Sequence, residues 1–103
     1  SLEKNDIRKI VDIEISKLVD RVTKLGYKIS ITEKAKDFIC ENGYDKKNGA
    51  RPLNRAIQKF IENLIAEEIV NNKIKEGDEL YIDHLKTDNF LTLASKKNKK
   101  KTD

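Results

Sequence analysis

The chain has 103 residues, of which 39% are charged and 37% hydrophobic. This length is enough for one domain, whose core needs no disulfide or metal. No apolar run approaches the roughly 18 residues that span a bilayer, and the start shows no signal-peptide pattern. The single cysteine, Cys40, excludes an internal disulfide and favours a reducing compartment, so we expect a cytoplasmic protein. Because the chain contains no methionine, we expect it to be a piece of a longer protein.

The first part of the chain predicts a helix, a strand and a second helix. Over residues 4–26 apolar side chains recur every three or four positions, which is typical of an amphipathic helix, and Gly26 is expected to end it. Residues 28–32 alternate as a short strand. Thr32 can cap a helix over residues 33–42, in which Cys40 is expected to be a small core residue.

A charged loop and a long helix occupy the middle of the chain. Residues 43–51 are rich in turn formers. Pro52 suits a first helical position, and the predicted helix runs from there to about Asn72. The apolar face over residues 53–70 is broad, which indicates either a central core helix or an interface in the parent protein.

Two strands and a basic tail complete the chain. Residues 79–83 and 90–93 predict an antiparallel hairpin with a long loop, which the strand over 28–32 can join. The expected fold class is α+β, with three helices packed on one face of a small three-stranded sheet over residues 1–95. Residues 96–103 hold five of the 22 basic residues and one of the 18 acidic ones, which leaves 17 of each elsewhere. We expect this segment to be a disordered Lys-rich tail.

The sequence lacks the groups that catalysis by this chain alone would need. It contains neither a phosphate loop nor a dinucleotide fingerprint. One histidine, His84, and one cysteine cannot form an ordinary zinc site, so no metal ligands are predicted. His84 is expected at the solvated surface. The isolated chain is therefore not expected to be an enzyme.

The most informative element is Gly49-Ala50-Arg51-Pro52-Leu53. An arginine at a helix N-terminus lies beside unpaired N–H groups and the positive end of the macrodipole, a place that suits an anion. Its guanidinium can hold a phosphate in a bidentate fork. Arg55 lies one turn later on roughly the same face. Pairing of Arg51 with a local carboxylate is the ordinary alternative, and any phosphate it contacts must be held by another domain.

These residues resemble the C-terminal small domain of Clp-family AAA+ unfoldases, in particular the second ATPase module of the ClpB and ClpC type. The resemblance covers residues 2 to about 94. It is carried by four elements in order, Gly43-Tyr44-Asp45, Gly49 to Gln58, Ala66-Glu67-Glu68-Ile69 and Glu76-Gly77-Asp78. The chain departs from the family pattern at Lys46 and Asn48, where a proline and an aromatic residue are usual, so the loop is expected to be less rigid.

The resemblance implies a lid subdomain of a ring-forming ATPase, usually hexameric, that unfolds or disaggregates proteins. In that family the arginine of Gly-Ala-Arg is the sensor 2 residue, which contacts the ATP phosphates. The role falls here on Arg51, with Gly49, Ala50 and Arg55 beside the nucleotide. ATP, with Mg, would be bound mainly by the large subdomain. The implied partners are neighbouring subunits of a homo-hexameric ring, unfolded or aggregated substrates and a ClpP-type peptidase, without a membrane or nucleic acid.

The residues themselves leave two other classes of function possible. One is a nucleic-acid-binding module that uses the Lys-rich tail, although the remaining residues carry no net charge. The other is an autonomous protein-interaction domain that uses the broad apolar face of residues 53–70.

Overall fold

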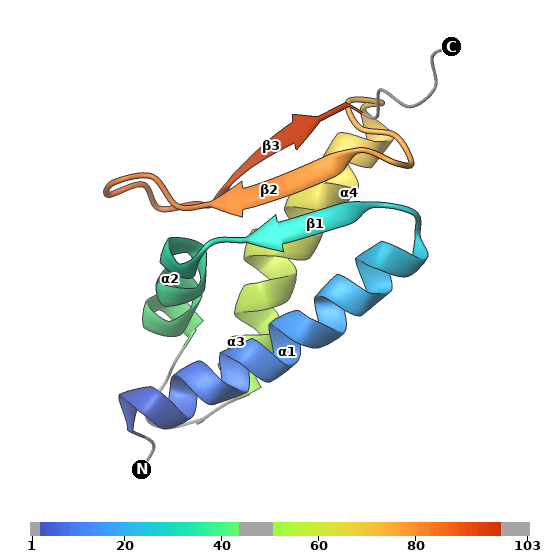
Figure 1. The fold of residues 1–103 in the computed structure, drawn as a ribbon. Helices are drawn as coiled ribbons and strands as arrows, with labels where there is room; N and C mark the ends of the chain where they lie inside the picture. The colour runs from blue at the N-terminus through green and yellow to red at the C-terminus, as the bar shows by residue number, and fades with distance from the viewer. Residues whose placement is uncertain (1–2, 44–50, 98–103) are drawn as a thin grey trace.

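Helices cover one face of a three-stranded sheet in the computed structural model (Figure 1). The structure describes residues 3–43 and 51–97, except for the side chains of Arg51 and Pro52. The elements in order are α1 (Lys4–Lys24), β1 (Lys28–Ile31), α2 (Glu33–Gly43), α3 (Arg51–Ile57), the π-helical segment η1 (Gln58–Glu62), α4 (Asn63–Val70), β2 (Glu79–Asp83) and β3 (Thr92–Lys96). Because α3, η1 and α4 follow one another without a break, they form one helical run. The predicted α+β fold, three helices on a three-stranded sheet, is confirmed.

Helix α1 ends at Lys24, two residues before its predicted limit, and Gly26 stops it as predicted, with a positive φ of 103°. The Tyr27 N–H donates to the Val22 carbonyl at 3.3 Å, and the Gly26 N–H donates to the Thr23 carbonyl at 2.9 Å. This pair of bonds is a Schellman motif, and the buried side chains of Val22 and Tyr27 provide the apolar contact that accompanies it. The chain therefore reverses sharply into β1.

Thr32 caps α2 as predicted. Its Oγ1 accepts a hydrogen bond from the Ala35 N–H at 3.1 Å, which satisfies one of the unpaired donors of the first turn. The same hydroxyl donates to Asp83 Oδ1 at 2.7 Å, and the His84 N–H donates to that oxygen at 2.8 Å. These two hydrogen bonds, the Thr32 one foremost, lower the pKa of Asp83. The start of α2 is thereby tied to the end of β2.

The long third helix contains a π-helical turn that the sequence pattern does not predict. Buried residues recur every four positions along it, at Leu53, Ile57, Ile61 and Ile65. An α-helix has 3.6 residues per turn, so each step of four rotates the side chain by about 40° away from the face. The wider η1 turn, in which the Asn63 N–H donates to the Gln58 carbonyl, offsets part of that rotation. All four side chains consequently reach one core.

The helical run ends two residues before the predicted limit of about Asn72. Its last α-helical residue is Val70, and Asn72 adopts a left-handed φ of 59°. The Lys73 N–H donates to the Glu68 carbonyl at 2.9 Å and the Asn72 N–H to the Ile69 carbonyl at 3.0 Å. Asparagine thus does here what glycine does after α1.

The sheet has the order β1-β2-β3, with β2 in the centre. β1 pairs with β2 in parallel from Lys28↔Glu79 to Ile31↔Ile82, and β2 pairs with β3 antiparallel. The third strand was predicted over residues 90–93 but lies at Thr92–Lys96. The reason is that Leu91 is packed into the core from the preceding loop, and the ladder begins only where Thr92 lies opposite Asp83.

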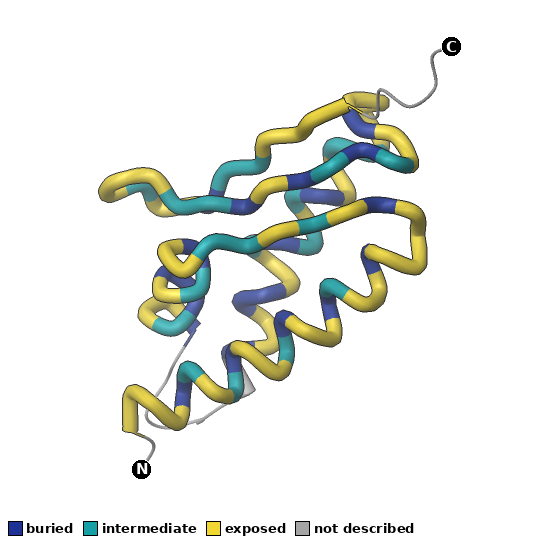
Figure 2. Tube along the Cα trace, viewed as in Figure 1, coloured by how far each residue is buried: buried dark blue, intermediate teal, exposed yellow. Residues whose placement is uncertain are grey.

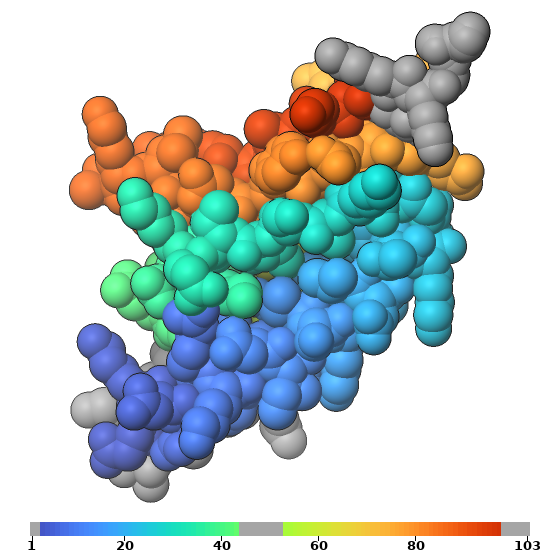
Figure 3. Space-filling model, in the orientation of Figure 1, coloured from blue at the N-terminus to red at the C-terminus, as the bar shows by residue number. Residues whose placement is uncertain are grey.

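One core joins the helices to the inner face of the sheet. Figure 2 shows the buried positions on the sides of the elements that face one another. On β2, Leu80 and Ile82 are fully buried, whereas Tyr81 between them is 40% exposed on the opposite face. α1 and β1 contact each other, and they lie side by side on the face drawn in Figure 3. Cys40 is half-buried against this core, close to its predicted role.

The Glu76-Gly77-Asp78 turn ties the sheet to the end of α1. The Gly77 N–H donates to the Gly26 carbonyl at 2.7 Å, and the Lys28 N–H donates to the Asp78 carbonyl at 3.1 Å. The buried carboxylate of Asp78 accepts from the Lys75 N–H at 2.9 Å and pairs with Lys97 Nζ at 3.2 Å. The segment predicted as a tail thus begins in contact with the sheet, and residues 98–103 lie outside the description.

Candidate functional site

Gly43 brings the end of α2 against α3. This buried glycine is the last residue of α2. A Cβ built on it would lie 2.9 Å from Ala56 Cβ and 2.9 Å from Leu53 Cδ2. Carbon atoms in ordinary contact are about 3.5–4.0 Å apart. The two helices therefore meet more closely than any side chain at residue 43 would allow, and the chain leaves α2 from a fixed point.

Helix α3 carries the two arginines of the predicted phosphate contact. It begins at Arg51, one residue before the predicted start at Pro52. Arg55 follows four positions later, so the two Cα atoms lie on roughly one face of the helix. Gly49, Ala50 and the side chain of Arg51 lie outside the described residues, and their contact with a nucleotide stays a prediction.

Arg55 differs from the other two arginines whose side chains are described. Arg8 pairs with three carboxylates of α1 and α2, and its hydrogen bond to Glu33 raises its pKa. Arg21 pairs with Glu62. Arg55 is exposed and forms no hydrogen bond or ion pair with any residue in the described ranges. Its donors are therefore available for an anion from outside these ranges.

An aromatic contact joins α2 to η1. The ring centroid of Phe38 lies 5.0 Å from that of Phe60, in an edge-to-face arrangement. It lies 4.4 Å from the centroid of the His84 imidazole. His84 Nε2 lies 2.7 Å from the Asp88 carbonyl oxygen. His84 is half-buried rather than fully solvated as predicted, because Phe38 covers one face of its ring. No local sequence signal linked these residues, which are far apart in the chain.

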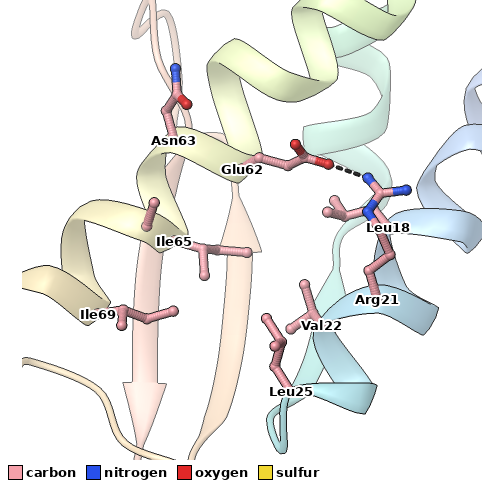
Figure 4. A pocket seen from close by; sticks show the side chains of 9 residues that line it. Leu18, Arg21, Val22, Leu25, Glu62, Asn63, Ile65 and Ile69 are labelled. Carbon is pink, nitrogen blue, oxygen red and sulfur yellow. Dashed lines mark hydrogen bonds and ion pairs between the residues drawn. The ribbon is translucent and has the colours of Figure 1, made fainter.

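A cavity lies elsewhere, between α1 and the run from η1 to α4. It is an open, mainly apolar groove of about 470 Å³, and the Arg21–Glu62 pair crosses it (Figure 4). Arg55 does not line it. The groove is lined by Leu18, Arg21, Val22, Leu25, Glu62, Asn63, Ile65, Ala66 and Ile69.

The described residues show neither a metal-binding cluster nor a membrane-spanning helix. No group of three or more His, Cys, Asp or Glu side chains converges there as metal ligands would. None of the described helices has the length and apolar character needed to cross a membrane.

Comparison with known proteins places this fold and its Arg-bearing helix in a family. Residues 2–82 match the family described as the C-terminal, D2-small domain, of ClpB protein. The chain belongs to this D2-small family. The match covers the structure from α1 into β2, including Gly43, Arg51 and Arg55.

Curated relatives of this D2-small domain are subunits of Clp proteases. The chain is 45% identical over 83 residues to the ATP-dependent Clp protease ATP-binding subunit ClpC of Staphylococcus saprophyticus, covering 81% of the chain and 10% of the relative. It is 40% identical over 82 residues to the ClpA homolog of Cyanidium caldarium, covering 80% of the chain and 10% of that protein. The chain thus spans about a tenth of the length of these relatives.

The D2-small domain carries an exposed arginine at α3 but no phosphate loop of its own. Its sequence has no phosphate loop, and Arg55 has no carboxylate partner among the described residues. An exposed guanidinium fits a phosphate as a chemical partner. The adenosine and the metal of a nucleotide complex would need groups from another domain.

Proposed function

We propose that this chain is the lid domain of a Clp-type ATPase and supplies the sensor 2 arginine, Arg51, to ATP bound on a large subdomain of the same ATPase. The observation that carries the proposal is the start of α3, where Arg51 is followed one turn later by Arg55, which is exposed and pairs with no residue of the described ranges. Membership of the D2-small family supports it. A guanidinium placed at the phosphates stabilises the negative charge that develops there during hydrolysis.

The lid role also gives the proposed site a way to report nucleotide state. Arg51 begins a helix that is packed into the core through Leu53, Ala56 and Ile57. A contact between Arg51 and phosphate would therefore orient the whole domain, and loss of the phosphate would release it. Neighbouring subunits of a homo-hexameric ring, unfolded or aggregated substrates and a ClpP-type peptidase are the partners that this proposal entails, in the cytoplasm.

A chimeric ATPase tests the proposal. The matching segment of Staphylococcus saprophyticus ClpC is replaced by this chain, and steady-state ATP hydrolysis is measured. Arg51→Ala is expected to lower kcat by at least about tenfold, since removing one preorganised charge donor typically costs more than that. Arg21→Ala is the matched control, because that arginine pairs with Glu62 on another face. The sensor assignment is wrong if Arg51→Ala turns over ATP as fast as the unsubstituted chimera.

The isolated chain provides a second comparison. Without a phosphate loop it is expected to hydrolyse no ATP, and to bind it only weakly. Turnover by the purified chain that survives Arg51→Ala would point to a different active site.

A further inference from the structure

Gly43 has a steric role that its backbone conformation does not explain. Gly26 and Gly77 have positive φ, which L side chains rarely adopt, but Gly43 does not and is the last residue of a regular helix. Alanine would be the better helix former at such a position. The absence of a side chain at Gly43 is therefore required by what lies against it.

The atoms that lie against Gly43 belong to α3 and have little freedom to move. Ala56 Cβ is attached directly to the helix backbone, and Leu53 Cα, at 3.3 Å, is part of it. The Leu53 side chain, whose Cδ2 lies at 2.9 Å, is fully buried and has no solvent to swing into. To reach ordinary carbon–carbon separations, a Cβ at residue 43 would displace α3 from α2 by roughly 0.6–1.1 Å.

We propose that Gly43 is a positioning residue for Arg51, a role that rests on the function proposed above. Leu53 is two residues from Arg51 in the same helix, so a shift of α3 at Leu53 moves the start of the helix with it. Catalytic contacts are sensitive to displacements of this size, since misplacement by about 1 Å can reduce turnover on the order of 100-fold. Gly43 thus affects the rate of ATP hydrolysis indirectly, because it sets the position of α3 and so of Arg51.

A double-mutant cycle in the ClpC chimera tests this role. Gly43→Ala is expected to lower kcat for ATP hydrolysis by on the order of 10- to 100-fold. In the Arg51→Ala background the same change should have no further effect, because residues that act as one unit are not additive. The control is Glu41→Ala, an exposed change on the same turn of α2, which should leave kcat within twofold.

Relief of the contact provides the rescue. Ala56→Gly removes the fixed methyl group that lies 2.9 Å from the added Cβ, so Gly43→Ala with Ala56→Gly should recover most of the lost turnover. Ala56→Gly alone reports the cost of a glycine within α3. The positioning role is refuted if Gly43→Ala behaves like Glu41→Ala, if it still lowers kcat in the Arg51→Ala background, or if Ala56→Gly restores nothing. Unchanged turnover in Arg51→Ala alone would instead overturn the sensor assignment.

A measurement on the isolated chain covers the case in which the Gly43→Ala chimera does not assemble. The amide ¹H–¹⁵N spectrum of Gly43→Ala should show shifts at Arg51 and along α3, with the amides of β2 and β3 unchanged. Shifts spread over the sheet, or no shift in α3, would show that residue 43 does not set the position of this helix.

Discussion

Phe38 is expected to contribute more to stability than its exposed counterpart Phe90. Phe38 is 5% exposed and packs between the rings of Phe60 and His84. Replacing a buried phenylalanine with alanine typically costs about 3–5 kcal/mol. The free energy of unfolding of a chain of this size is roughly 5–15 kcal/mol. The Phe38→Ala variant should therefore keep only part of the unfolding free energy of the unsubstituted chain. The corresponding fall in Tm is roughly 12–40 °C.

Urea unfolding followed by far-ultraviolet circular dichroism measures this difference. Linear extrapolation gives the free energy of unfolding of each variant. Phe90→Ala removes the same atoms from a side chain that is 57% exposed, and should cost less than about 1 kcal/mol. The packing argument is refuted if Phe38→Ala costs as little as Phe90→Ala.

The ends of α1 and α2 and the ion pair between α1 and η1 can each be tested by one substitution. Thr32→Ala should lose about 1 kcal/mol of cap stabilisation by urea unfolding. Because the pKa of Asp83 is lowered, this carboxylate stabilises the fold above pH 3.8, its ordinary pKa, and the stabilisation is lost as the pH falls through the pKa of the folded state. Thr32→Ala should weaken this dependence of the unfolding free energy on acid pH. The same pH dependence in both proteins would contradict the role of the Thr32 hydrogen bond. Gly26→Ala, at φ 103°, should cost at least about 1 kcal/mol, checked by thermal unfolding. Arg21→Ala should cost less than about 1 kcal/mol, and less still in 1 M NaCl, because its pair with Glu62 is partly exposed; a larger, salt-independent loss would refute a surface pair.

The sequence predicts those parts of the fold that depend on local chemistry. Gly26 and Thr32 mark helix ends because a positive φ and a capping hydroxyl are properties of single residues. The alternation of residues 79–83 predicts β2 within its observed bounds. The start of β3 depends instead on where Leu91 fits into the core, which no pattern within the hairpin specifies.

Contacts between distant segments account for the rest. The π turn over residues 58–62 arises because four buried side chains must face one core, a requirement that only the assembled helices impose. His84 looks like a solvated residue until Phe38, 46 positions earlier, is packed against it. At the candidate site, the roles of Arg51 and Arg55 are predicted from their spacing and from the family resemblance, and they stay predictions. The closeness of Gly43 to Leu53 and Ala56 emerges only in three dimensions.

The central place of β2 has a consequence for the order in which the domain folds during synthesis. β1 pairs with a strand that begins 51 positions later, from Lys28 to Glu79. At about 5–20 residues per second, translation takes roughly 3–10 s to cover that distance. Throughout that time the apolar sides of α1 and α2 lack Leu80 and Ile82, the fully buried residues of the central strand. The sheet is therefore expected to form late in synthesis, with the apolar sides of the first two helices uncovered until the central strand emerges.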